Sequence, residues 1–145
     1  MFDLKEKDEP DLRSEAECFP EIDHGVEVAG DRVLVQLRRE KTTSKGGIIL
    51  VDETRQTLRF NETVAKVCQV GPLAYKSPDT LEPWPEGPWC QVGDLVRTIK
   101  YGGDRFVVQP DDDGAPVVFI TIQAREVISR IKSFEAAQKM KAFVD

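Results

Sequence analysis

The chain has 145 residues, with 20 Lys and Arg against 26 Asp and Glu, so its net charge at neutral pH is −6. This length suits one compact domain with appendages and excludes an α/β barrel of about 250 residues. The acidity argues against nucleic-acid binding, which depends on basic side chains that neutralise phosphates. The longest apolar runs, Ile48–Val51 and Val117–Ile120, fall far short of the ~20 residues of a membrane-spanning helix. The N-terminus shows no secretion signal, so we expect a cytoplasmic protein.

Residues 1–30 contain ten acidic and three basic side chains, which gives this segment a net charge of −7. That exceeds the net charge of −6 for the whole protein. Their apolar residues are scattered and show no sustained period. This composition predicts an acidic extension that is partly disordered. A solubilising role and a role as a partner-binding arm are both open for it.

From Asp31 onward the sequence predicts short strands separated by turns. In the first of these, alternation of Val33, Val35 and Leu37 with their neighbours puts one apolar face inward. The expected strands are 33–37, 63–70, 95–101, 105–109 and 117–122, the last two joined as a hairpin across 110–114. Residues 123 to about 143 have a composition and apolar spacing compatible with a helix. The sequence therefore predicts an all-β protein, a small barrel with a short C-terminal helix.

Two segments exceed what a minimal barrel needs. Residues 39–62 combine polar flanks with Gly46-Gly47 and the aliphatic run Ile48–Val51. Loops of this length are usually functional or disordered, although Ile48–Val51 is equally consistent with another core strand. The second segment, Pro72–Cys90, is rich in proline and contains one tyrosine and two tryptophans. It predicts a long excursion held by proline stiffness and aromatic packing.

Four motifs occur in a specific order along the chain. They are Asp31-Arg32-Val33-Leu34-Val35, Gly46-Gly47-Ile48-Ile49-Leu50, Val67-Cys68-Gln69-Val70-Gly71 and Val92-Gly93-Asp94-Leu95-Val96. Each motif is weak alone, but together, in this order and spacing, they resemble the GroES-type co-chaperonins. The resemblance covers about residues 31–131 and continues through Tyr101-Gly102-Gly103, Val118-Phe119-Ile120 and Glu126–Ile131.

The resemblance implies a GroES-like β-barrel that acts as a lid. Members of this family form seven-membered, dome-shaped rings that close an ATP-driven GroEL-type chaperonin around a client protein. A mobile loop of each subunit docks a glycine-hinged aliphatic tripeptide into the chaperonin. On this sequence the mobile loop is about 39–62, and the chaperonin-binding residues are Gly46, Gly47, Ile48, Ile49 and Leu50. The resemblance also implies a homo-heptamer that needs no cofactor of its own, because the partner binds the ATP.

The chain is longer than the family pattern requires. We expect an acidic extension (1–30), a GroES-like barrel domain (31–131) and a C-terminal tail (132–145). The insertion at about 72–90 falls where the family builds the roof of its dome, which predicts a modified roof. Enlarged members of this kind resemble those carried by bacteriophages, and a phage source would place the protein in the host cytoplasm.

Catalytic and metal sites find little support. His24, the only histidine, lies in the acidic extension, so a nucleophile would lack an anchored base. Asp111-Asp112-Asp113-Gly114 lacks the ligand spacing of a calcium loop, and Gly102-Gly103-Asp104-Arg105 lacks the Lys and Ser or Thr of a phosphate loop. The three cysteines are widely spaced and form no CxxC pair, so they indicate neither a zinc site nor a disulfide framework. We expect a protein that is not an enzyme.

Two other functions compete with the lid. A GroES-like barrel could be a virion structural or decoration protein, with the aliphatic loop as a permanent arm into a neighbouring subunit. The polar, glycine-hinged flanks favour a reversible loop instead. A nucleic-acid-binding barrel is the third option, and the acidity of the chain argues against it.

Overall fold

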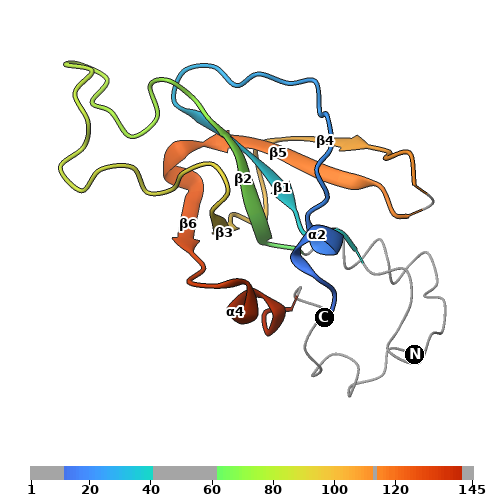
Figure 1. The fold of residues 1–145 in the computed structure, drawn as a ribbon. Coiled ribbons are helices and arrows are strands. Elements are labelled where there is room, and N and C mark those ends of the chain that lie inside the picture. Colours follow the sequence, from blue (N-terminus) through green and yellow to red (C-terminus); the bar gives the residue numbers. More distant parts are fainter. Residues whose placement is uncertain (1–11, 41–61, 113, 142–145) are drawn as a thin grey trace.

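A computed structural model describes residues 12–40, 62–112 and 114–141. Six antiparallel strands form one sheet in the order β4-β5-β1-β2-β3-β6 (Figure 1). The strands are β1 (Arg32–Leu37), β2 (Val64–Val70), β3 (Leu95–Thr98), β4 (Asp104–Val108), β5 (Val117–Gln123) and β6 (Val127–Arg130). The helices are α2 (Glu15–Cys18), the 3-10 helix η1 (Ala124–Glu126) and α4 (Phe134–Gln138). The prediction of an all-β fold with little helix is confirmed.

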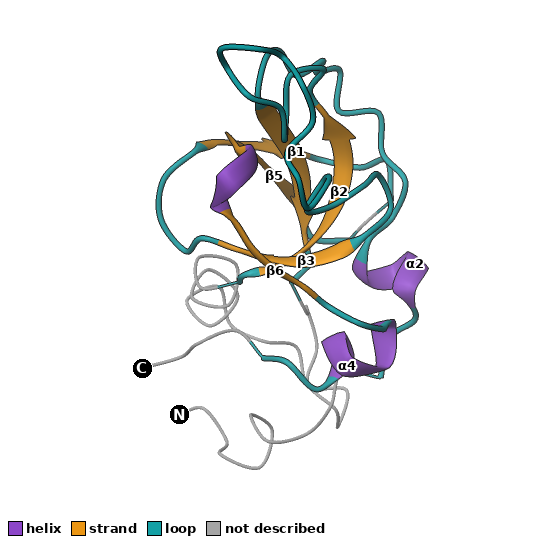
Figure 2. Ribbon diagram, turned by 90° about the vertical axis from the view of Figure 1, so that its left-hand side faces the viewer, coloured by secondary structure: helices purple, strands orange, loops and turns teal. Residues whose placement is uncertain are grey.

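The sheet curves round into a barrel (Figure 2). The chain leaves β5, near one end of the strand order, and passes through η1 directly into β6 at the other end. Apolar side chains from the strands and from the β2–β3 connection fill the interior. The largest cluster of buried residues comprises Val33, Val35, Leu37, Ala65, Val67, Ala74, Tyr75, Cys90, Val96, Val118, Ile120, Ile122, Ala124 and Val127.

β1 is buried on both faces, although its alternation predicted a single inward face. Leu34 points away from the interior, yet it is fully buried. It packs with Val117 and Phe119 of β5 in a second cluster on the outside of the sheet. A segment of the N-terminal extension covers this cluster and hides the outer face of β1.

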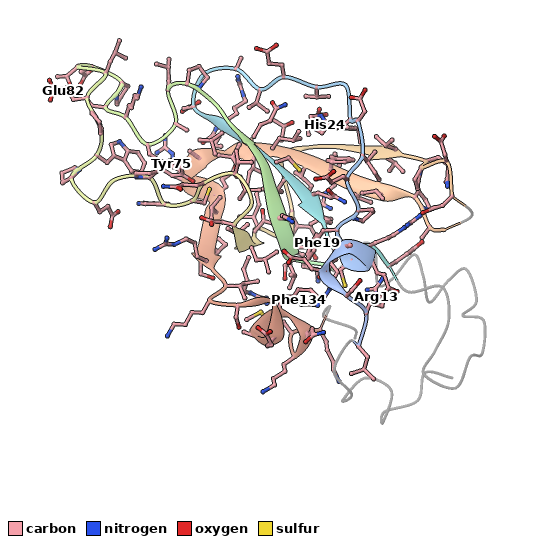
Figure 3. The ribbon with its side chains drawn as sticks, viewed as in Figure 1. Arg13, Phe19, His24, Tyr75, Glu82 and Phe134 are labelled. Carbon is pink, nitrogen blue, oxygen red and sulfur yellow. The ribbon has the colours of Figure 1, made fainter. Side chains whose placement is uncertain are left out.

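That covering segment, residues 21–30, is called the strap. It runs from α2 across the sheet to the start of β1 and carries His24 toward the strands (Figures 1 and 3). Its even-numbered residues are half-buried and its odd-numbered residues are exposed. Ile22, Val26 and Val28 pack on the outer cluster. The side-chain amide of Gln69 holds the strap, accepting from Val28 N at 3.0 Å and donating to Val26 O at 2.9 Å.

The strap corrects one sequence-based interpretation. The first thirty residues were interpreted as having no sustained period, but residues 21–30 alternate with a period of two. The exposed positions include Glu21, Asp23 and Glu27, so the acidic side chains of the strap face solvent. The half-buried positions are few and one of them is a histidine, so the alternation is hard to see in the sequence. From residue 12 onward the extension therefore lies on the barrel.

The expected helix from residue 123 to about 143 was wrong over most of its length. Val127–Arg130 is strand β6, and α4 covers only Phe134–Gln138. β6 pairs with β3 through Val96↔Arg130, Arg97↔Ser129 and Thr98↔Val127. Without it, the backbone groups along that edge of β3 would have no partner in the sheet, and this pairing outweighs the helix-like spacing. β3 also ends at Thr98, short of the expected Tyr101.

The proline-rich excursion between β2 and β3 packs on itself, as predicted. The rings of Tyr75, Trp84 and Trp89 lie 5.2 to 5.7 Å apart, centroid to centroid. The hydroxyl of Tyr75 donates to Ala124 O at 2.8 Å, and burial raises the pKa of this phenol. Tyr75 lies at the base of the excursion and Glu82 at its tip (Figure 3). The excursion is thus anchored at the corner where β5 turns into β6.

Gly103 shows why the turn before β4 needs glycine. Its φ is +73°, a backbone conformation that is strained for residues with a side chain. A Cβ at this position would lie 2.7 Å from Ile120 Cγ2 and 2.8 Å from Thr121 O. The turn can therefore lie close against β5 only with glycine.

The three cysteines remain as thiols, with no disulfide between them. Burial raises the pKa of Cys68 to about 11, which keeps that thiol protonated and unreactive at neutral pH. Within residues 12–40, 62–112 and 114–141, no group of three or more His, Cys, Asp or Glu side chains could hold a metal ion. None of the helices in those ranges is long and apolar enough to cross a membrane.

Candidate functional site

The predicted chaperonin-binding residues Gly46, Gly47, Ile48, Ile49 and Leu50 lie outside the described residues. The description of the chain stops at Glu40 and resumes at Glu62. What the structure shows is how the two ends of the 41–61 segment are held. We call residues 38–40 and 62–64 the stems, and their contacts define the candidate site.

Arg38 ties the two stems together. Its guanidinium forms a buried ion pair with Glu62, with Nη2 2.9 Å from Oε1. Its backbone N–H donates to Val64 O at 2.9 Å. The carboxylate of Glu62 in turn accepts from Val64 N at 3.2 Å. Burial raises the pKa of Glu62 even though Arg38 favours the charged form.

Arg39 ties the first stem to the turn between β4 and β5. Its Nε donates to Ala115 O at 2.7 Å, and its two terminal nitrogens hold both carboxylate oxygens of Asp112 at 2.7 and 3.1 Å. Planar, two-point pairing of this kind is the strong form of an arginine contact. Gly114 packs directly against the guanidinium, where a side chain would clash. Two successive arginines therefore fix the chain as it leaves β1.

The Arg39 contact predicts a specific acid titration. Hydrogen bonds from Arg39 and Gly114 lower the pKa of Asp112 to about 2 from an ordinary value of 3.8. Because the folded-state pKa is depressed, the contribution to stability is present above pH ~3.8 and is lost as pH falls toward 2. Carboxyl NMR of the folded protein should give a midpoint near 2 for Asp112. In Arg39→Ala the midpoint should rise toward 3.8. A midpoint near 3.8 in the wild-type protein would contradict the pairing of Arg39 with Asp112.

Helices α2 and α4 lie beside the stems and beside each other (Figures 1 and 2). Ser14 begins α2 with a capping box, in which Glu17 N donates to Ser14 Oγ at 3.2 Å and Ser14 N to Glu17 Oε1 at 3.2 Å. Phe19 follows α2 and Phe134 begins α4, and both belong to one cluster at the base of the barrel (Figure 3). This basal cluster comprises Cys18, Phe19, Val64, Leu95, Ile131 and Ala137, with Phe134, Ala136 and Met140 packed against it.

A family model and several known proteins match this chain. The family model "Chaperonin 10 Kd subunit" matches residues 26–119, from the strap into β5. The chain belongs to this family. It is similar to the co-chaperonin GroES of Chlamydia pneumoniae, at 29% identity over 103 residues that cover 71% of this chain and 87% of that protein. The co-chaperonin GroES of Chlamydia trachomatis serovar L2 is 33% identical over 100 residues, covering 69% and 84%.

The family gives the function in outline: the protein is a co-chaperonin, and the family is non-enzymatic. Both statements agree with the sequence-based expectation. The matched range of the chaperonin 10 family includes both stems and the excursion. It leaves out residues 12–25, which contain α2, and residues 120–141, which contain β6 and α4.

Arg38, Arg39 and Glu62 were not predicted from the sequence as site residues. Arg39 and Glu62 were counted as the ends of the predicted loop, whereas the structure places both against the barrel. One signal was available, since two arginines directly follow a strongly apolar strand and a glutamate precedes the next. Charged residues at such positions pair when the strands are neighbours, as β1 and β2 are.

Proposed function

We propose that the protein is the lid of an ATP-driven, GroEL-type chaperonin ring and closes it over a folding client in the cytoplasm. The observation that carries the proposal is the chaperonin 10 match over residues 26–119, on a barrel that holds both stems of the 41–61 segment at one place. ATP belongs to the chaperonin, and this chain contributes binding and enclosure.

The contact with the chaperonin is assigned to Gly46, Gly47, Ile48, Ile49 and Leu50. Burying three aliphatic side chains gives roughly 5 to 9 kcal/mol at about 1.5 to 3 kcal/mol each. Ordering a segment on binding costs about 2 to 5 kcal/mol or more, so one copy binds weakly. Several copies on one ring bind tightly through effective concentration and release together when the partner changes shape.

A ring requires contacts between subunits, and we propose a homo-heptamer. In the described sheet, β4 and β6 are the end strands and have one neighbour each. Each presents an exposed aliphatic residue, Val107 on β4 at 54% and Ile128 on β6 at 62%. Free strand edges with apolar side chains are suited to pairing with another subunit.

The excursion of residues 72–90 is assigned to the roof of the dome. Its three aromatic rings and its anchor on Ala124 support a rigid projection rather than a loose loop. A virion role and a bacteriophage source have no support in the relatives named above, which are bacterial co-chaperonins.

Two measurements test the proposal together. Native mass spectrometry should give a seven-subunit particle, and a pull-down with a GroEL-type chaperonin should recover the protein only when ATP is present. A monomer whose recovery does not depend on ATP would contradict the proposed lid function. A stable heptamer that never binds the chaperonin would support the proposed ring but contradict the proposed partner.

A further inference from the structure

The two terminal extensions of this chain meet at the stems. The segment at α2 and the segment at α4 both lie outside the residues that match the chaperonin 10 family. They pack against each other through the basal cluster, which also contains Val64 of the second stem. The two extensions therefore lie next to the stems, outside the range that the family model matches.

Hydrogen bonds join each extension to the stems and to each other. The backbone N–H of Arg39 donates to Cys18 O, at the end of α2, at 2.8 Å. The guanidinium of Arg38 donates to Ala137 O, in α4, at 2.9 Å. The Gln138 side chain joins the C-terminal extension to the N-terminal one by donating to Arg13 O at 3.2 Å.

Arg38 is the residue at which these connections cross. Its side chain reaches the second stem through Glu62 and the C-terminal extension through Ala137, and it is only 6% exposed. A buried ion pair contributes little net stability, because desolvation offsets the attraction. Its better attested effect is to fix one arrangement of the chain among several.

We propose that the two extensions form a buckle that fixes both stems, with Arg38 as a positioning residue for chaperonin binding. This inference rests on the proposed function. Stems that are already fixed need not be ordered when the protein binds the chaperonin, which raises affinity without a new contact. The gain is repeated in every subunit of a ring.

The test removes the charges and keeps the fold. In the double variant Arg38→Met with Glu62→Gln, no charge is left buried without a partner. The side-chain amide oxygen that Glu62→Gln introduces still accepts from Val64 N, and Ala137 O keeps the Met140 N–H at 3.0 Å. We expect a melting temperature within a few degrees of wild type. Dissociation of the full-length protein from the chaperonin in ATP should be faster by on the order of tenfold or more.

Three further variants separate positioning from stability. Arg38→Met alone leaves the buried Glu62 carboxylate without its ion-pair partner, so this variant should lose both stability and binding. Tyr75→Phe removes the bond to Ala124, far from the buckle, and should lower stability without changing dissociation. Ser133→Ala removes the N-cap of α4, which accepts from Ala136 N at 3.1 Å, and should speed dissociation even if the double variant does not fold.

The outcomes are distinct. Binding that recovers together with stability in the double variant would overturn the buckle, as would wild-type dissociation in Ser133→Ala. If the wild-type protein itself never binds the chaperonin in ATP, the proposed function fails first. If wild type binds and the buckle variants bind equally well, only the buckle fails.

Discussion

Replacing Ile49 by aspartate is expected to abolish binding to the chaperonin while the ring stays assembled. Each copy loses the burial of one aliphatic side chain, worth about 1.5 to 3 kcal/mol. Each copy must also desolvate a carboxylate if it is to dock at all. In the proposed ring several copies bind together, so the loss multiplies over the copies and a modest change per site becomes complete release. Native mass, co-migration with the chaperonin in ATP and suppression of its ATPase measure the result.

Thr43→Asp is the matched control, since it adds the same charge within the same 41–61 segment but outside the aliphatic tripeptide. It should bind as wild type does. An Ile49→Asp variant that still co-migrates and still suppresses the ATPase would show that the binding residues lie elsewhere. A loss of the ring in Ile49→Asp would place this residue in subunit assembly.

The strands of the barrel could be predicted because their apolar patterns are strong and their ends are marked by turn residues. Thr63–Val70 was expected and Val64–Val70 is observed, while the expected hairpin pairs Val108 with Val117. β6 could not be predicted in the same way. Its four residues include three exposed side chains, so its burial carries no strand period, and only the edge of β3 decides its conformation.

The stems could not be predicted for a similar reason. The proposed binding tripeptide, Ile48-Ile49-Leu50, is contiguous in sequence, and the resemblance to GroES-type co-chaperonins implied it. The contacts of Arg38 join residues 24 and 99 positions away. Nothing in the neighbourhood of Arg38 indicates Ala137 as its partner, because that partner depends on where the C-terminal extension packs. Long-range contacts of this kind follow from the fold and not from a local motif.

The second large effect concerns Phe119, whose replacement by alanine should destabilise the protein by about 3 to 5 kcal/mol. Phe119 is fully buried in the outer cluster, between the sheet and the strap. Its ring stacks on Phe106, with ring centroids 5.3 Å apart and planes 13° apart, and the ring of His24 in the strap lies 5.3 Å away at a tilt. Domains of this size are stable by about 5 to 15 kcal/mol, so the loss is a large share of the total.

Urea unfolding at fixed protein concentration measures the loss, and a thermal midpoint lower by on the order of 10 °C should accompany it. Tyr101→Ala is the control, an aromatic truncation at a site that is 67% exposed, and it should cost less than about 1 kcal/mol.

The strap should respond as well, because its apolar residues lose their main contact. Hydrogen exchange at Val28, whose N–H donates to Gln69, should speed up in Phe119→Ala. If stability falls but exchange at Val28 does not change, the amide of Gln69 holds the strap without the outer cluster. If stability falls by less than about 1 kcal/mol, Phe119 is not the residue on which the packing of the strap depends.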